Sequence, residues 1–348
     1  MNITQVAKLL GVSTGTVSRA LNNRSEINSE TRRRVLDMVA ELGYAPNINA
    51  VRLMRRDNSF LAIECLNRSS VLSNAYLSNL IRAIGCVAND KGYDLLLRMR
   101  NSHARPLECI TSVAGQILIT TSKELAEASL AYSRSSAVPT VVICDQKALR
   151  FSECSYVVID AAAGVTEAVK YLTGSGHRRI GYVGSGNAGG DVRDVFLTVA
   201  NQYGLVCAED HRIEAGIHEA GAFEATRLIM SRMDPPTAIF ARTDVLAFGV
   251  IHALKTLGLS VPGDVSVLAY GDLEIGYMEK TPLTTIRVDI DALAQVAVTT
   301  LLDMVEEGAF QADHRVAPNL VIRETCGPVL ATEIVSRAGI MENRRRFD

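Results

Sequence analysis

Apolar segments of strand length alternate with amphipathic helical segments from residue 59 onwards, and this alternation constrains the fold more than any other feature. The runs FLAIECL, DLLLRM, GQILITT and VPTVVICD are predicted strands, and NAYLSNLIRAIGCVANDKGY is a predicted amphipathic helix that ends at Gly92. Strands that alternate with helices pair in parallel through right-handed crossovers. The segments therefore predict a parallel sheet covered by helices.

A second series of the same kind follows. YVVID leads into AAAGVTEAVKYLTGSGHRRIGYVGS, and then come RIEAGI, GAFEATRLIMSRM, TAIFART, DVLAFGVIHALKTLGL and VSVLAYGD. Two successive α/β halves predict a core of two lobes with a cleft between them.

Bulk properties limit the class of protein. A length of 348 residues is long for one core and predicts two or three domains. No apolar run reaches the roughly 18 residues that span a bilayer, and MNITQVAKLL lacks the features of a signal peptide. We therefore expect a cytoplasmic protein with no membrane association.

Motifs for catalysis and for cofactors are absent from the sequence. It contains no P-loop, no G-x-S-x-G and no H-E-x-x-H, and GSGNAGG is only superficially like a dinucleotide-binding loop. Seven scattered cysteines, an odd number, favour free thiols over a zinc site or a disulfide framework. We expect no metal, no cofactor and no enzyme activity. The alternative function is that of an enzyme built on a Rossmann-like core.

Charge is distributed unevenly along the chain. Residues 1–56 hold nine basic against four acidic residues, a net charge of +5, within a chain whose total is -2. The remainder therefore carries -7. A basic N-terminal segment on an acidic body is typical of a polyanion-binding head, because Lys and Arg displace counterions from phosphates, although a solvated surface is equally compatible with charge alone.

The first helix of this segment is predicted to be capped by Thr4. Val6, Leu9 and Leu10 are expected to share its buried face, and Gly11 supplies the left-handed residue that ends it.

The second helix is predicted to begin after Ser13 as its cap and to stop at Asn22-Asn23. Its inward residues are Val17 and Leu21, while its outward residues are Thr14, Gly15, Ser18 and Arg19. In the third predicted helix, Asn28 is the cap and the buried stripe consists of Val35, Met38, Val39 and Leu42.

A helix, a glycine turn and a short helix with a polar outer face form the helix-turn-helix arrangement, whose second helix enters the DNA major groove. A small helical cap domain is the alternative, but small and cationic outer residues would bury little against protein. Arg19 is the strongest candidate for reading a base, because a guanidinium pairs bidentately with guanine. Gly15 has no side chain with which to read one.

The segment ITQVAKLLGVSTGTVSRALNN, followed by INSETRRRVLDMVAELGYAPNINAVRLMR, resembles the head of the LacI/GalR family of bacterial transcription regulators. The resemblance implies sequence-specific binding of double-stranded DNA at a pseudo-palindromic operator by a homodimer. The implied DNA-contacting residues are Thr4, Ser13, Thr14, Gly15, Thr16, Ser18, Arg19, Asn22, Tyr44, Asn47, Ala50 and Leu53.

Residues 47–57 are predicted to form a hinge. Pro46 ends the preceding helix, Asn47 can cap a new one, and about nine residues are too few to stay helical unaided in water. By the family resemblance, paired hinge helices insert Leu53 into the minor groove, whereas an ordinary linker leucine is the alternative.

The resemblance continues into the core with GHRRIGYVG, PPTAIFARTDVLAFG and PLTTIR, which look like a periplasmic-binding-protein-like sensor. The fold class expected is α/β, with an all-α helix-turn-helix head and a doubly wound, two-lobed core that dimerises. The predicted parts are the head 1–46, the hinge 47–57 and the core 58–348, with an N-lobe of about 58–158 and 288–318, a C-lobe of about 159–287 and 319–335, and a tail 336–348. The resemblance implies three passages between lobes, near 157–160, 285–289 and 317–320.

The resemblance also implies a small-molecule effector between the lobes. The candidate contacts are Asn74, Tyr76, Asp160, Arg193, Thr243, Asp244 and Asp272. For Asp244, capping of the helix that follows is left open beside ligand contact.

The sequence departs from sugar-responsive members, which carry R-x-x-x-x-G-[FY], A-x-N-D and G-F-D-D. Arg193 lies three residues before Phe196, whereas the pattern requires six. Thr243 replaces the Asn, and Gly271 replaces the first Asp. Each buried hydrogen bond left unmade costs about 1–3 kcal/mol, so a plain monosaccharide is disfavoured. Either the cleft takes another metabolite, with Arg193 or Arg242 meeting an acidic group, or regulation depends on a protein partner and no ligand.

Overall fold

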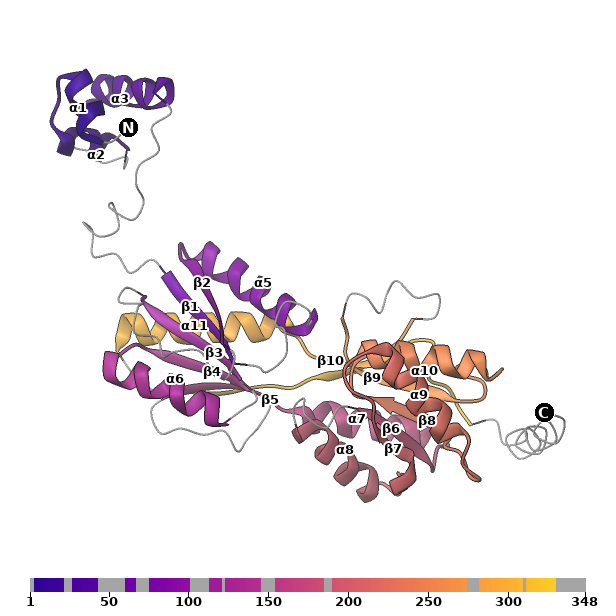
Figure 1. The fold of residues 1–348 in the computed structure, drawn as a ribbon. Coiled ribbons are helices and arrows are strands. Elements are labelled where there is room, and N and C mark those ends of the chain that lie inside the picture. The colour runs from indigo at the N-terminus through magenta and orange to yellow at the C-terminus, as the bar shows by residue number, and fades with distance from the viewer. Residues whose placement is uncertain are drawn as a thin grey trace. The chain divides into compact units, whose positions relative to one another are not determined.

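The computed structural model (Figure 1) separates into two compact units, residues 1–59 and 60–348, which are described individually below. The structure describes the ranges 3–21, 27–42, 60–66, 75–100, 113–120, 123–144, 154–184, 190–273, 282–308 and 311–329.

The first unit is a bundle of three helices. They are α1 (Ile3–Leu10), α2 (Thr14–Leu21) and α3 (Ser29–Glu41). Val6, Val17 and Val35, one from each helix, are at most 1% exposed and form the centre of a small core. Met38, Val39 and Leu42 pack against it, as the predicted stripe of α3 requires.

Local chemistry fixes the helix ends. The Ser13 hydroxyl accepts a hydrogen bond from the Thr16 N–H at 3.1 Å, and the Asn28 side chain accepts one from the Glu30 N–H at 2.8 Å. Gly11 has a φ of +65°, the left-handed conformation that glycine adopts without strain at a helix end. The predicted roles of Ser13 and Asn28 as N-terminal caps and of Gly11 as the end of α1 are confirmed.

Two predictions for α1 are wrong. The helix already includes Ile3, so Thr4 lies in its first turn and is not the residue that precedes it. Leu9 is 60% exposed, whereas Val6, Ala7 and Leu10 face the core. Successive helical residues are rotated by roughly 100°, and once Ala7 belongs to the buried face, Leu9 falls outside it.

The second unit contains two six-stranded sheets. The first sheet has the order β11-β5-β4-β3-β1-β2, and all its pairs are parallel. Its strands are β1 (Phe60–Leu66), β2 (Asp94–Arg100), β3 (Gly115–Thr120), β4 (Thr140–Cys144), β5 (Ser155–Ile159) and β11 (Asp313–Val316). Its helices are α5 (Ala75–Asp90), α6 (Lys123–Ser136) and α11 (Ile290–Glu307). We call this part the first lobe.

The second sheet has the order β12-β10-β9-β8-β6-β7, with β12 antiparallel to β10 and the other pairs parallel. Its strands are β6 (Ile180–Gly184), β7 (Arg212–Glu214), β8 (Ala238–Ala241), β9 (Ser266–Gly271), β10 (Thr284–Arg287) and β12 (Asn319–Val321). Its helices are α7 (Ala161–Gly174), α8 (Gly190–Gln202), α9 (Glu219–Met230) and α10 (Asp244–Thr256), with the short 3-10 helix η2 (Glu209–His211) before β7. This part is the second lobe.

Helices cover both faces of each sheet. In the first lobe, Ile117 and Ile119 of β3 pack with α5 and α11, while Leu118 between them packs with α6. In the second lobe, Phe240 packs with α7 and α8, and Ile239 packs with α9 and α10. This alternation in burial is the period of two expected of a strand covered on both faces, and the predicted doubly wound, two-lobed fold is confirmed.

The chain passes between the two sheets three times. It leaves β5 for α7 at Asp160, returns from β10 to α11 at 288–289, and leaves β11 for β12 at 317–318. The Asp289 side chain caps α11 by accepting a hydrogen bond from the Ala292 N–H at 2.9 Å. Each passage is short, so residues at the ends of β5, β10 and β11 lie close to both lobes.

Neither a membrane segment nor a metal cluster is found in the ranges listed above. No described helix combines the length and the apolar character needed to cross a bilayer. No group of three or more His, Cys, Asp or Glu side chains among the described residues is arranged to hold a metal ion.

A buried histidine ties the start of β6 to the end of the described chain. The Nδ1 atom of His177 lies 2.8 Å from the Thr237 hydroxyl, and its Nε2 atom lies 3.1 Å from the Gly327 carbonyl oxygen. Burial lowers the pKa of His177 below its ordinary 6.5, and the hydrogen bond with Gly327 opposes this only in part. The folded chain therefore holds a neutral imidazole at pH values where the unfolded chain binds a proton.

We predict that the free energy of unfolding falls as the pH drops below 6.5, with part of this fall due to His177. His177→Gln should cost about 1–2 kcal/mol at neutral pH by weakening one hydrogen bond. Its deficit relative to the wild type should shrink as the pH falls, because glutamine does not titrate. Denaturant unfolding across this pH range checks the prediction, and a deficit that is constant with pH would contradict it.

Candidate DNA-binding head and effector site

Helix α2 presents a polar face to solvent. Val17 and Ala20 are at most 2% exposed, whereas Thr14 and Arg19 are exposed. Predictions for the side chains of Ser18 and Leu21 lie outside the described part of the structure. The helix is therefore held to the head by two small apolar residues and leaves a cation on its open side.

Gly15 lies beneath the Arg19 side chain. A Cβ atom at position 15 would be 3.6 Å from Arg19 Nη2 and 3.6 Å from Ser13 Oγ, which are ordinary van der Waals distances. The position is therefore not closed to other residues by steric hindrance. Glycine there leaves the Arg19 guanidinium without a competing side chain at position 15.

The remaining predicted DNA contacts fall into two groups. Thr4 and Ser13 are exposed and Thr16 is half-buried, with the Ser13 and Thr16 hydroxyl oxygens 2.9 Å apart. The others lie outside the described residues: Asn22, Tyr44, Asn47, Ala50 and Leu53.

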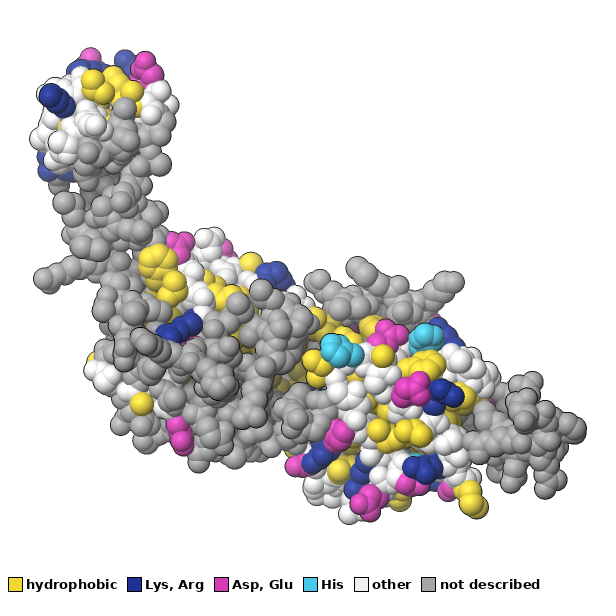
Figure 2. Space-filling view, viewed as in Figure 1, with side chains coloured by type: hydrophobic (Ala, Val, Ile, Leu, Met, Phe, Trp, Pro, Cys, Tyr) yellow, Lys and Arg dark blue, Asp and Glu magenta, His cyan; other side chains and the backbone are white. Residues whose placement is uncertain are grey.

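Acidic and basic side chains are interspersed on the face of the second lobe visible in Figure 2. Ion pairs on this lobe include Arg179–Asp234 at 3.1 Å and Arg227–Glu224 at 3.4 Å. A mixed surface of this kind does not favour a polyanion, so the DNA-binding prediction rests on the head.

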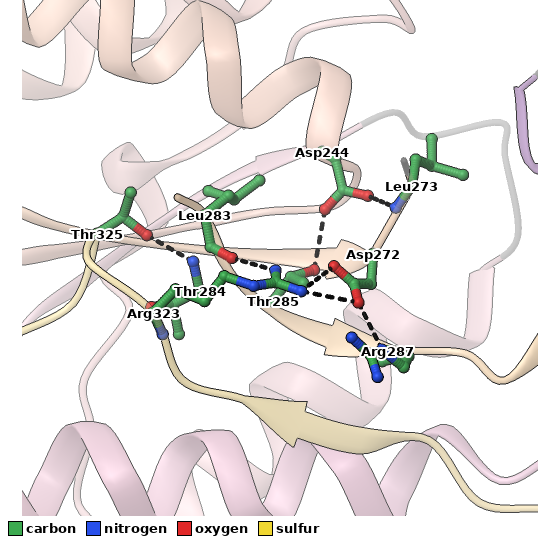
Figure 3. Close-up of polar contacts among 9 residues, drawn as sticks. All are labelled: Asp244, Asp272, Leu273, Leu283, Thr284, Thr285, Arg287, Arg323 and Thr325. Carbon is green, nitrogen blue, oxygen red and sulfur yellow. Dashed lines mark hydrogen bonds and ion pairs between the residues drawn. The ribbon is translucent and has the colours of Figure 1, made fainter. Parts of the chain in front are cut away.

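Several predicted effector residues lie at the carboxyl edge of the second sheet. Thr243 and Asp244 follow β8, and Asp272 follows β9. Because these strands are parallel neighbours, their carboxyl ends lie side by side. Figure 3 shows the polar network that Asp244 and Asp272 form there.

The Asp244 carboxylate is engaged by the protein itself. It is fully buried, and it accepts hydrogen bonds from the Leu273 N–H at 2.7 Å and from the Thr285 hydroxyl at 2.9 Å. The cap of α10 is Thr243, whose hydroxyl accepts from the Leu246 N–H at 3.3 Å. Asp244 thus is not the helix cap; it joins β9 and β10.

Burial raises the pKa of Asp244 from 3.8 to about 6, although its two hydrogen bonds act in the opposite direction. The nearby Asp272 carboxylate raises the pKa further, and Arg323 lowers it. The carboxyl group is therefore ionised at pH 7 at an energetic cost, which the network reduces but does not remove.

Asp272 is held by two arginines. Its side chain is 2% exposed and lies between Arg287 of β10 and Arg323, which follows β12. Arg323 Nη2 is 2.8 Å from one carboxylate oxygen and 3.0 Å from the other, and Nη1 donates to the Leu283 carbonyl at 2.6 Å. A carboxylate buried this deeply requires such compensation.

Threonines extend the network beyond the ion pairs. The Thr284 N–H donates to the Thr325 hydroxyl at 2.8 Å, and that hydroxyl donates to the Val267 carbonyl at 2.7 Å. The Arg323 N–H donates to the Thr284 hydroxyl at 2.9 Å. The segment after β12 is thereby fixed to β9 and to the start of β10.

Gly271 explains one departure seen in the sequence. Its φ is +137°, and a Cβ atom there would lie 2.9 Å from Asp244 Oδ2. An aspartate at this position would be strained in its backbone and would meet another carboxylate. The conformation that buries Asp244 therefore requires glycine.

The other predicted effector residues are dispersed. Arg193 Nη1 lies 2.8 Å from Glu214, and Arg193 Nε lies 3.2 Å from Asp194. Asp160 Oδ2 lies 3.9 Å from Arg315 Nη1 at the first passage between lobes.

In the first lobe, Tyr76 is half-buried on α5 and packs against the core, and Asn74 lies outside the described residues. The sequence does not single out Thr285, Arg287 or Arg323 as site residues: Thr285 and Arg287 lie in the PLTTIR segment, and Arg323 belongs to none of the motifs named above.

Two family models match the chain. Residues 2–47 match the model described as "Bacterial regulatory proteins, lacI family", and residues 169–326 match "Periplasmic binding protein-like domain". The chain therefore combines a LacI-family DNA-binding head with a periplasmic-binding-protein-like domain. It is accordingly a DNA-binding transcription regulator, and the curated relatives reported below are regulators of transcription and not enzymes.

Relatives and solved structures match along nearly the whole chain. The HTH-type transcriptional regulator DegA of Bacillus subtilis (strain 168) is 29% identical over 340 residues, which cover 94% of this chain and 98% of DegA. The HTH-type transcriptional repressor PurR of Glaesserella parasuis is 29% identical over 332 residues, covering 92% and 94%. The Lac repressor dimer bound to operator and the anti-inducer ONPF is similar in fold, with a TM-score of 0.78, 24% identity and coverage of 94% and 99%.

We predict that Asp244→Asn changes how the stability of this periplasmic-binding-protein-like core depends on pH. Between pH 3.8 and about 6 the folded chain keeps a proton that the unfolded chain releases, so this stabilisation is lost as the pH rises through 6. Asparagine accepts from Leu273 N–H and donates to Thr285 without titrating. The difference in free energy of unfolding should shift in favour of the variant by up to about 3 kcal/mol from pH 4 to pH 7. A difference independent of pH would contradict the burial of an ionisable Asp244.

Proposed function

We propose that the protein is a homodimeric repressor whose two heads bind a pseudo-palindromic operator and whose core responds to a small molecule between the lobes. The observation that carries this proposal is the arrangement of α2, where buried Val17 and Ala20 leave Thr14 and Arg19 exposed on a helix capped by Ser13. That is the geometry of a recognition helix presented to a major groove. Because operator binding requires access to chromosomal DNA, we propose that the protein is located in the cytoplasm.

In this proposal Arg19 reads a guanine through O6 and N7, and Thr14 and Ser13 approach neighbouring base edges. Thr4, Thr16, Ser18, Asn22 and Tyr44 are the proposed additional DNA contacts and position the head without choosing the sequence. Gly15 contributes no hydrogen bond, so a single bidentate contact provides much of the direct readout on this turn.

The hinge completes the complex. Asn47, Ala50 and Leu53 belong to a helix that forms when two hinges pair on the operator, with Leu53 wedged into the minor groove. A half-site repeated by two-fold symmetry then matches the symmetry of the dimer.

A ligand controls binding if it favours one arrangement of the lobes. The short passages at Asp160, 288–289 and 317–318 support this role, because a change between the lobes is transmitted through few residues. Asp160, Tyr76, Asn74 and Arg193 are retained as proposed ligand contacts. A regulator controlled by a protein partner alone is the competing proposal.

We predict that Arg19→Ala reduces operator affinity about tenfold to hundredfold while changing affinity for random DNA much less. The cause is the loss of base recognition in addition to one phosphate-attracting charge. Arg33→Ala removes an exposed cation from α3 and serves as the charge-matched control, with equal small losses on both DNAs. Titrations at one fixed salt concentration provide the measurement, and undiminished discrimination in Arg19→Ala would refute the assignment.

We further predict that Leu53→Ala weakens operator binding far more than non-specific binding, because the wedge acts only where the DNA is kinked. Fluorescence titrations with operator and scrambled duplexes check this. Equal losses on the two duplexes would rule out the wedge.

A further inference from the structure

Arginines at the carboxyl edge of the second sheet differ in their pairing. Arg193 pairs with Glu214 and Asp194, and Arg287 and Arg323 pair with Asp272. Arg242, which follows β8 directly, has no ion-pair partner within the described ranges. The same edge therefore has three compensated guanidinium groups and one without an acidic partner among the residues described.

Arg242 is nevertheless held in a defined place. Its backbone N–H donates to the Val183 carbonyl at 2.9 Å, and its guanidinium carbon lies 5.0 Å from the centre of the Tyr270 ring. Its Nε atom is buried and finds no hydrogen-bond acceptor in the part of the chain that the structure describes. A guanidinium keeps its charge throughout the physiological pH range, so this buried donor calls for an acceptor.

Tyr182 supplies a second donor nearby. The register pairs Tyr182 of β6 with Phe240 of β8, so Arg242, two residues further along, continues the same face of the sheet. The Tyr182 hydroxyl lies over Gly184 at the carboxyl end of β6, where a Cβ atom would overlap it. The residue is 1% exposed, and no hydrogen bond to this hydroxyl occurs among the described residues.

The phenol is a donor at neutral pH. Burial raises the pKa of Tyr182 to about 12, and Arg242 is near enough to oppose this rise. Ring stacking fixes the side chain, since the Phe196 and Phe240 rings lie 6.1 Å from that of Tyr182. Its hydroxyl is thus aimed at the edge that Arg242 occupies.

We propose that the effector is a small organic anion whose carboxylate or phosphate group binds the Arg242 guanidinium and the Tyr182 hydroxyl. The inference rests on the proposed function, because it assumes that this edge is where the ligand sits. It also accounts for the departures from sugar-responsive sequences. Asp244 and Asp272, the carboxylates that could accept hydrogen bonds from sugar hydroxyl groups, already interact with other groups of the protein. Arg242 and Tyr182, in contrast, are hydrogen-bond donors.

Three probes that share a sugar ring test the charge requirement on the full-length chain: glucose, glucuronate and glucose 6-phosphate. Each is titrated at millimolar concentration and constant ionic strength while thermal unfolding is followed. Glucuronate, glucose 6-phosphate or both should raise the unfolding midpoint saturably, and glucose should not. The two charged probes distinguish a carboxylate ligand from a phosphate ligand. Saturable binding of neither anion, or equal binding of glucose, would overturn the proposal.

Variants assign the binding to these residues. Arg242→Gln should weaken the anion at least about tenfold, the value of a charged hydrogen bond, and Arg242→Lys should keep a preference for the anion over glucose. Tyr182→Phe preserves the stacked ring and should weaken the anion severalfold. Arg227→Gln, an equal loss of charge on exposed α9, is the matched control and should bind as the wild type does. Undiminished binding in Arg242→Gln, or loss only in Arg193→Gln, would overturn the assignment.

Operator binding separates failure of this inference from failure of the proposed function. Ligand-free Arg242→Gln should retain the preference of the wild type for operator over random duplex. If the wild type itself shows no such preference, the proposed function fails. If it discriminates normally but ignores both anions, only the present inference fails.

Discussion

Compensation of two buried carboxylates organises the second lobe. Asp272 is almost fully enclosed and depends on Arg287 and Arg323, while Asp244 depends on the Leu273 N–H and the Thr285 hydroxyl. Removing one partner from such a pair leaves an isolated charge, which costs about 3–5 kcal/mol. The network therefore joins the ends of β8, β9 and β10 and the segment after β12 into a single unit.

That unit lies beside the passages between the lobes. Thr285 and Arg287 belong to β10, and two residues after β10 the chain reaches Asp289, which caps the helix α11 of the first lobe. Arg323 follows β12, the strand formed just after the third passage. A rigid edge connected to short passages is suited to transmit a change at the ligand site, because packed elements shift between discrete arrangements. Because Asp244 and Asp272 are used for structure, Arg242 and Tyr182 are, among the described residues of this edge, polar groups that remain available to a ligand.

Local and periodic signals in the sequence predict the structure correctly. Ser13, Asn28 and Gly11 act on residues within a few positions of themselves, and β1 and β9 are runs whose two faces are both buried. The prediction for Leu9 is wrong because, in an eight-residue helix, one small buried residue, Ala7, shifts the buried face. The role of Asp244 could not be decided from its neighbours in sequence: its partners Leu273 and Thr285 are brought to it by strand pairing.

Ligand control requires that operator binding by the head is coupled to ligand binding by the core. Linkage requires that an anion which changes operator affinity by some factor has its own affinity changed by the same factor when operator is bound. The most direct test is to measure the operator affinity of the full-length chain with and without a saturating anionic probe, and the affinity for that probe with and without operator. Coupling between the two sites predicts equal factors, clearly different from one, and predicts that both factors fall to one in Arg242→Gln. Tight binding of both operator and anion with no effect of either on the other would contradict it.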